Sequence, residues 1–134
     1  MMRGIDTNVL VRFVVQDDKR QSAIASRLIE KQCSSTEPAL ISLVVLCEFV
    51  WVLSKAYKYQ RREIAAVLKQ VLVTECFHVS KYDVAWGAML DYTIEQGDYA
   101  GYIIARLNEQ SGAETTLTFD KRVSKNKRFT LLSD

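Results

Sequence analysis

The chain has 134 residues, of which 49% are hydrophobic, 25% are charged, five are glycine and one is proline. This length and composition predict one compact domain over residues 1–134 and exclude a disordered or low-complexity protein. The net charge of +2 says little about partners. No apolar run reaches the length of a bilayer span and no signal peptide is recognisable, so we expect a cytoplasmic protein with no membrane association.

Asp6 is the first candidate functional residue, because it lies between a predicted strand, Met2 to Ile5, and a predicted helix, Asn8 to Val15. An ionised carboxylate at the edge of a core is costly unless a cation, a hydrogen-bond donor or water satisfies it. Thr7 and Asn8 are residue types that cap helices. Taken alone, the triplet therefore favours a helix start.

Two adjacent acids, Asp17 and Asp18, precede a second predicted helix at Ser22 to Glu30. Acids at the start of a helix and Lys31 at its end agree with the helix macrodipole. We therefore assign both aspartates a capping role and no catalytic role.

Glu48 is the only acid of a third predicted helix, about Leu43 to Tyr57, which follows a predicted strand at Ala39 to Ser42. The helix is apolar over most of its surface. Glu48 therefore lies either on a narrow exposed stripe or in a shared pocket, and both interpretations are open. The excess apolar surface, which includes Trp51, also indicates a self-association face.

The rest of the chain continues the alternation of helices and strands. Asp98 is placed to cap the sixth predicted helix, and Asp120 follows its strand as Asp6 follows the first. The predicted elements are helices at Arg61 to Val73, Tyr82 to Gln96 and Asp98 to about Gln110, strands at Phe77 to Val79 and Glu114 to Phe119, and a possible edge strand at Phe129 to Leu132.

This order predicts an α/β fold with a mostly parallel sheet, and ligands bind outside the carboxyl ends of such strands. Asp6, Glu48, Asp98 and Asp120 are expected at that edge. Gathered carboxylates repel one another unless a divalent cation is present, and oxygen ligands without His or Cys select Mg²⁺ or Mn²⁺. A metal held by acids and surrounded by Lys and Arg suits phosphodiester hydrolysis.

Three motifs, distributed over nearly the whole chain, each carry an acid. They are Ile5-Asp6-Thr7-Asn8-Val9-Leu10, Ser42-Leu43-Val44-Val45-Leu46-Cys47-Glu48 and Thr116-Leu117-Thr118-Phe119-Asp120. In this order they resemble the motifs of PIN-domain proteins, which include the VapC-type toxins of toxin–antitoxin pairs.

This resemblance implies a three-layer α/β/α sandwich and a Mg²⁺- or Mn²⁺-dependent endoribonuclease. It also implies a homodimer that is inhibited by a cognate antitoxin protein. By the same likeness Asp6, Glu48 and Asp120 bind the metal, and Asn8 and Thr118 orient them.

At one position the chain departs from the family pattern. VapC-like members usually read Asp-Phe-Ala-Asp-Ala-Leu-Ile-Ala, and here the stretch is Asp98-Tyr99-Ala100-Gly101-Tyr102-Ile103-Ile104-Ala105. Gly101 stands where an acid normally faces the metal, and Asp98, three residues away, is either a further metal ligand or only a cap. Fewer carboxylates bind a hard cation more weakly, so we expect reduced or conditional nuclease activity.

Several basic side chains are candidates for contact with RNA phosphates. For each one taken singly, an exposed charge that keeps the protein in solution is an equally good interpretation. The candidates are Arg12, Arg106, Lys121 and Arg122, together with the cluster of Lys55, Lys58, Arg61 and Arg62.

Two other classes of function are open. Gly101 favours a nucleic-acid-binding or antitoxin-sequestering module that has kept the fold and lost efficient cleavage. A receiver-type phosphoacceptor domain ranks last, because the Asp6-Thr7-Asn8 and Ile41-Ser42 junctions supply neither a pair of acids nor an acceptor aspartate.

Overall fold

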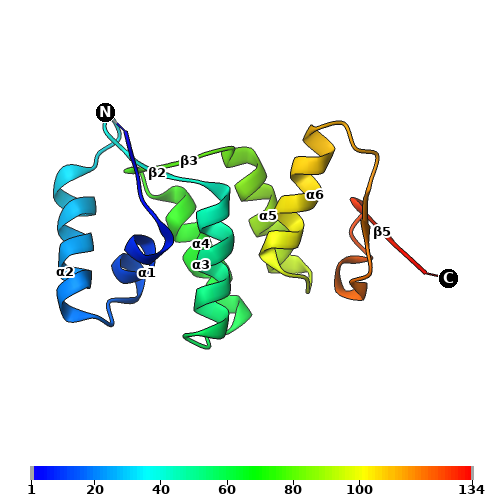
Figure 1. Ribbon diagram of the computed structural model, residues 1–134, viewed down its shortest axis with the longest axis horizontal. Coiled ribbons are helices and arrows are strands. Elements are labelled where there is room, and N and C mark those ends of the chain that lie inside the picture. The colour runs from blue at the N-terminus through cyan, green and yellow to red at the C-terminus, as the bar shows by residue number, and fades with distance from the viewer. Residues whose placement is uncertain (1, 134) are drawn as a thin grey trace. The chain divides into compact units, whose positions relative to one another are not determined.

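The computed structural model describes residues 2–133, which form two compact units divided between Tyr82 and Asp83 (Figure 1). Unit 1 extends to Tyr82, and unit 2 begins at Asp83. Strands alternate with helices, and every strand pair is parallel, so the predicted α/β class is confirmed. Among residues 2–133 no helix is long and apolar enough to cross a membrane.

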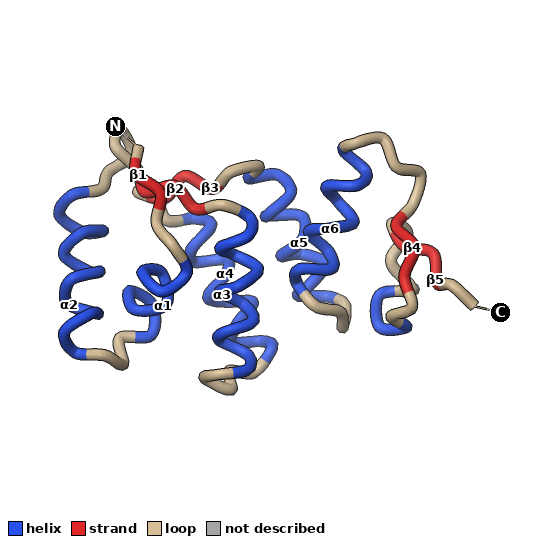
Figure 2. The backbone as a smooth tube through the Cα atoms, in the orientation of Figure 1, coloured by secondary structure: helices blue, strands red, loops and turns tan. Residues whose placement is uncertain are grey.

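The described part of unit 1 contains a parallel sheet in the order β1-β2-β3, visible in Figure 2, and the helices α1 to α4. Arg3 pairs with Ala39, and Ala39 pairs in turn with Phe77. The elements are β1 (Arg3–Gly4), α1 (Thr7–Val15), α2 (Lys19–Arg27) continued by a π-helical turn (Leu28–Gln32), β2 (Ala39–Ile41), α3 (Leu43–Lys55), α4 (Arg61–Val73) and β3 (Phe77–Val79).

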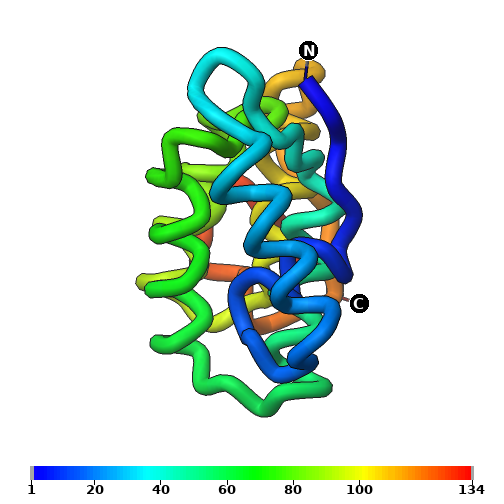
Figure 3. Tube along the Cα trace, turned by 90° about the vertical axis from the view of Figure 1, so that its left-hand side faces the viewer, coloured from blue at the N-terminus to red at the C-terminus, as the bar shows by residue number. Residues whose placement is uncertain are grey.

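The helices of unit 1 form because their apolar residues recur at helical spacing. On α3, Leu46, Phe49 and Leu53 are fully buried and lie on one face of the helix. The Ser42 hydroxyl begins α3 by accepting the backbone N–H of Val45 at 3.2 Å. Helix α1 packs against both α2 and α3, and its pairing with α2 is visible in Figure 3. This packing fixes the start of α1 beside α3.

The helix caps of unit 1 differ in part from the sequence interpretation. Asp18 caps α2 by accepting the N–H of Gln21 at 2.8 Å, as expected. The capping role assigned to Asp17 is wrong, because its side chain binds other side chains. At α1 the N-cap is Asp6 itself, and Thr7 and Asn8 lie within the first helical turn.

Asp17 joins a network that connects three segments of unit 1. The Tyr57 hydroxyl donates to its Oδ2 at 2.7 Å, and Arg12 Nη1 donates to its Oδ1 at 3.1 Å and to the Tyr57 oxygen at 3.0 Å. Arg12 Nε also donates to Gln21 at 2.7 Å. The hydrogen bond from Tyr57, then a backbone hydrogen bond and the charge of Arg12, lower the pKa of the Asp17 carboxyl.

Unit 2 is built from two helices and a pair of parallel strands. The strands found are shorter than predicted, and the helices end within two residues of the predicted ends. The elements are α5 (Tyr82–Ile94), which begins at the last residue of unit 1, α6 (Tyr99–Gln110), β4 (Thr116–Thr118), a 3₁₀ turn (Lys121–Val123) and β5 (Phe129–Leu131), with Thr116 paired to Phe129.

Buried tyrosines fix the connection between α5 and α6. The Tyr99 hydroxyl donates to the carbonyl oxygen of Ala85 at 3.0 Å, and the Tyr102 hydroxyl oxygen accepts the N–H of Gly97 at 2.8 Å. A Cβ at Gly97 would collide with Tyr102 and Val123. Only glycine therefore allows this close approach immediately before Asp98.

The Asp17 network predicts a pH dependence of stability. Because the folded pKa of Asp17 is lowered, the stabilisation is fully present above its unfolded pKa of about 3.9 and disappears as the pH falls through the folded value. In urea titrations, we expect wild type to exceed Asp17→Asn in unfolding free energy by a constant amount at neutral pH and by less below about pH 4. Tyr57→Phe should show the same trend, and an unchanged difference at low pH would contradict the assignment.

Candidate metal centre

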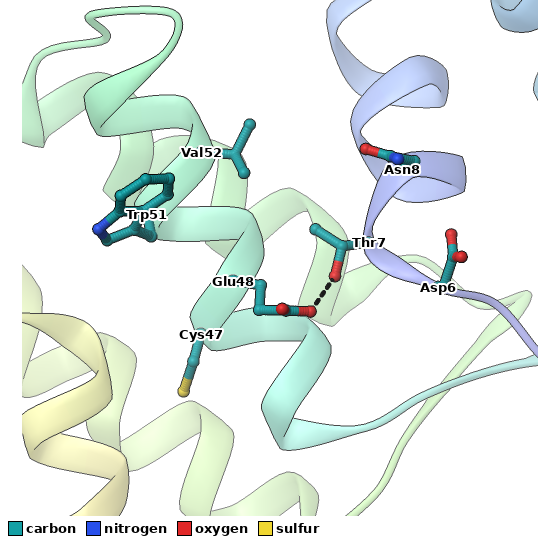
Figure 4. Close-up of a pocket in the computed structure, with 7 residues that line it drawn as sticks. All are labelled: Asp6, Thr7, Asn8, Cys47, Glu48, Trp51 and Val52. Atoms are coloured by element: carbon teal, nitrogen blue, oxygen red, sulfur yellow. Dashed lines mark hydrogen bonds between the residues drawn. The ribbon is translucent and has the colours of Figure 1, made fainter.

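Unit 1 contains a pocket of about 590 Å³ between the start of α1 and one face of α3 (Figure 4). One side carries the three consecutive polar residues that open α1, and the other carries the second and third turns of α3. The lining residues are Asp6, Thr7 and Asn8 on the first side and Cys47, Glu48, Trp51 and Val52 on the second.

Asp6 lines this pocket and also caps a helix. Its Oδ1 accepts the backbone N–H of Val9 at 3.4 Å, which is long for a hydrogen bond. The side chain is exposed, and the N-terminus of α1 stabilises its negative charge. The helix-start interpretation of the triplet is therefore correct, and it leaves the carboxylate at the pocket wall.

Glu48 lines the same pocket and is also exposed. The exposed stripe and the shared pocket, both left open by the sequence, therefore each describe part of its environment. Its Oε1 accepts the Thr7 hydroxyl at 2.6 Å. In Figure 4 Thr7 lies between Glu48 and Asp6 and points toward Glu48. Sequence reasoning gave Thr7 only a capping role, and its position beside Asp6 was the one available signal that it positions an acid.

Cys47 contributes a neutral wall to this pocket. Burial, and then the negative charge of the neighbouring Glu48, raise the pKa of the Cys47 thiol to about 11. A thiol with that pKa is protonated near neutral pH, so it is neither a nucleophile nor a soft metal ligand there. The ionisable groups of the pocket are thus its carboxylates.

Unit 2 brings together the other two predicted acids. Arg122 forms two parallel bonds with Asp120, Nε to Oδ1 at 3.1 Å and Nη2 to Oδ2 at 2.8 Å. The same Nη2 lies 3.5 Å from Oδ2 of Asp98. Asp98 occupies the N-cap position of α6, yet its side chain makes no capping hydrogen bond. Its carboxylate instead faces the guanidinium of Arg122.

Asp120 is held in place by its own turn. Its side chain caps the 3₁₀ turn by accepting the N–H of Arg122 at 2.8 Å, and its backbone N–H donates to the Thr118 hydroxyl at 3.0 Å. Hydrogen bonds from the Arg122 side chain and backbone lower the pKa of the Asp120 carboxyl. The Thr118 hydroxyl therefore holds the backbone of Asp120.

Gly101 lies in the first turn of α6, where its N–H bonds to the carbonyl of Asp98 at 3.0 Å. A Cβ added at this position would meet no atom within 4 Å. The structure thus has room for an acid at position 101. The absence of a carboxylate there is a property of the sequence and has no steric cause.

The basic candidates fall into two environments. Arg106 makes a two-bond ion pair with Asp91 at 2.8 and 3.1 Å, with the side chains 21% and 12% exposed, whereas the Arg122 side chain is 52% exposed. A Cβ on Gly87 would overlap the Arg106 guanidinium, so that group is packed into unit 2. The remaining candidates are Arg12, bound in the Asp17 network, half-buried Arg61, and the exposed Lys55, Lys58, Arg62 and Lys121.

Each unit therefore assembles two of the four predicted acids, Asp6 with Glu48 and Asp98 with Asp120. Within the described part of either unit, no group of three or more His, Cys, Asp or Glu side chains is placed to hold a metal ion. The donors fit a hard cation in kind, because all are carboxylates with threonine hydroxyls beside them. In unit 2, two of these carboxylates approach the same nitrogen, Nη2 of Arg122, at 3.5 and 2.8 Å.

Comparison with known proteins gives a family match over most of the chain. The family model described as PIN domain matches residues 5–128. A VapC ribonuclease from Aquifex aeolicus (strain VF5) is 24% identical over 124 residues, which cover 92% of this chain and 91% of that protein. No solved structure matches.

The ion pair of Arg106 gives a prediction that separates a structural role from RNA contact. Leaving the mostly buried Asp91 carboxylate unpaired costs about 1–3 kcal/mol. We therefore expect Arg106→Met to lower the unfolding free energy by about 2 kcal/mol in urea titrations. Adding Asp91→Asn should restore part of the loss. Wild-type stability combined with weaker RNA binding would instead show that the guanidinium is available to substrate.

Proposed function

The chain belongs to the PIN-domain family, and from that membership we propose that it is a metal-dependent endoribonuclease similar to the VapC relative. The proposed reaction is hydrolysis of RNA phosphodiesters with Mg²⁺ or Mn²⁺. Asp6, Glu48, Asp98 and Asp120 are the proposed metal-binding acids, and residues 1–134 are proposed to act as one PIN-like domain.

The convergence of Asp98 and Asp120 on one nitrogen of Arg122 is the observation that carries this proposal. The two acids come from the start of α6 and the end of β4, and no local rule of helix capping requires them to meet. At this point one oxygen of Asp98 and one of Asp120 contact the same positively charged group. Oxygen ligands of this kind suit Mg²⁺ or Mn²⁺.

A bound Mg²⁺ or Mn²⁺ would supply an activated water and neutralise charge on the phosphate in the transition state. The protein's own contribution is to hold the carboxylates in place. Thr7 donates to Glu48, the Thr118 hydroxyl accepts the N–H of Asp120, and Asn8 opens α1 next to Asp6. We propose that these side chains limit rotation of the acids, which lowers the cost of binding a cation.

Partners follow from the same proposal. We infer that RNA is the substrate, that a cognate antitoxin protein inhibits the enzyme, and that the chain acts as a homodimer in the cytoplasm. Trp51, 62% exposed, and Val44, 69% exposed, lie on one face of α3 and are candidates for the self-association surface. The exposed Lys121 and Arg122 beside Asp120 are candidates for phosphate contact.

A second function is favoured by Gly101. With an open position in place of the expected acid, metal affinity would be lower, and the chain would bind RNA or sequester an antitoxin with little cleavage. Binding of RNA in the presence of EDTA, without cleavage when Mn²⁺ is restored, distinguishes this module from an active nuclease.

The nuclease proposal predicts the effect of removing one carboxylate. Glu48→Gln keeps a side-chain oxygen that can accept from Thr7 and removes the charge. We expect Mn²⁺-dependent cleavage of labelled RNA to fall by at least about 100-fold, because even indirect ligand partners cost 10–100-fold. Glu30→Gln, the same substitution at an exposed site on the π-helical turn, should cleave like wild type. Equal activity of the two variants, or cleavage that persists in EDTA, would contradict the proposal.

Gly101 gives a gain-of-function prediction. Because a side chain at this position meets open space, Gly101→Asp should fold and add a carboxylate one helical turn from Asp98. We expect isothermal titration to show severalfold tighter Mn²⁺ binding than in Gly101→Asn, which has the same shape without the charge. We also expect faster RNA cleavage. If the two variants bind Mn²⁺ equally, position 101 does not face the metal.

A further inference from the structure

Arg122 occupies the place between Asp98 and Asp120 where the proposed function puts a metal ion. It satisfies both oxygens of Asp120 through its side chain, and it reaches Oδ2 of Asp98 with the same Nη2. Its backbone N–H adds a further bond to Asp120 at 2.8 Å. Five hydrogen bonds to these two acids thus come from one residue.

The position of Arg122 in the chain makes this pairing local and persistent. It lies two residues after Asp120, in the 3₁₀ turn that Asp120 itself caps. The short connection gives the guanidinium a high effective concentration at the carboxylate, so the pair re-forms readily after it opens. Side-chain exposures of 52% for Arg122 and 75% for Asp98 leave the arginine free to swing into solvent without disturbing the core.

We propose that Arg122 is a resident counter-ion of the metal site, which a divalent cation must displace before it binds Asp98 and Asp120. This inference rests on the proposed function, because it takes those acids as metal ligands. Arg122 would act as a regulatory residue of the site. It neutralises the two acids when metal is scarce, and it raises the metal concentration at which the site fills.

The charges explain why displacement is required. One guanidinium balances half of the −2 charge of the two carboxylates, and its N–H groups occupy lone pairs of both Asp120 oxygens and of Asp98 Oδ2 that a metal would otherwise use. A divalent cation at the same point would also be repelled by a guanidinium that stayed within a few ångströms. A cation that bridges Asp98 and Asp120 at this point must therefore displace Nη2 of Arg122.

The same geometry orders metal and RNA binding. While Arg122 is bound to the carboxylates, its Nε and Nη2 edge is occupied, so it cannot offer that edge to a phosphate as a two-bond contact. Once a cation displaces it, the guanidinium is released next to the site where phosphate would bind. Arg122 thereby couples the two events, which a simple surface arginine would not do.

The experiment is a Mn²⁺ titration of metal-free protein, by calorimetry and by electron paramagnetic resonance of free Mn²⁺. Arg122→Gln is compared with wild type and with Lys127→Gln, which removes the same charge from an exposed position on the same tail. We expect Arg122→Gln to bind Mn²⁺ about tenfold more tightly, which corresponds to about 1.4 kcal/mol. Lys127→Gln should change affinity much less. If both variants gain equally, only net charge matters, and the proposal is overturned.

A charge-conserving variant guards against a folding artefact. Arg122→Lys keeps the positive charge and loses the planar two-bond pairing. We expect its Mn²⁺ affinity to lie between those of wild type and Arg122→Gln, with a thermal unfolding midpoint near wild type. Wild-type affinity in both Arg122 variants would overturn the proposal.

Asp120→Asn separates failure of this inference from failure of the proposed function. If Asp120→Asn weakens Mn²⁺ binding and Arg122→Gln leaves it unchanged, the metal site stands and the counter-ion role falls. If wild type and Asp120→Asn bind Mn²⁺ equally, the metal site itself is wrong, and the role of Arg122 falls with it. Weaker RNA binding by Arg122→Gln in EDTA, with unchanged Mn²⁺ affinity, would assign the arginine to substrate contact alone.

Discussion

Compensation of carboxylate charge is the constraint on which the local structure of both acidic pairs, one in each unit, depends. Asp6 is compensated by the N-terminus of α1, Glu48 by the Thr7 hydroxyl, and Asp98 and Asp120 by Arg122. Each of these partners is weaker than a bound divalent cation. The acids are therefore satisfied well enough to fold and remain available for a stronger ligand.

Solvent exposure distinguishes the ion pairs of Arg106 and Arg122 in unit 2. Arg106 and Asp91 are mostly buried, and Gly87 leaves space for the guanidinium, so their pair is part of the packing. Arg122 makes a similar two-bond contact with Asp120, but it projects into solvent. Breaking the first pair would leave a buried charge, whereas water can solvate both partners of the second. The same pair of residue types is thus part of the packing in one place and accessible to solvent in the other.

Membership of the PIN-domain family confirms the resemblance read from three short motifs, and the departure at Gly101 becomes more informative in the structure. Nothing surrounds that position within 4 Å, so steric crowding does not explain the glycine. A metal site that lacks one carboxylate and holds an arginine between Asp98 and Asp120 would have a low affinity for metal. In the proposed metal site, both features would reduce the net negative charge that a cation meets.

The sequence by itself determined the order of helices and strands, the α/β class and the family, because periodicity and motif order are local properties of the chain. It also placed Asp18 as a cap, since capping involves residues three apart. Only the tertiary structure decided that Asp17 binds Tyr57, that Thr7 binds Glu48 and that Asp98 faces Arg122. Those partners lie 40, 41 and 24 residues apart. No local pattern encodes such pairings, because they form only when packing brings distant segments together.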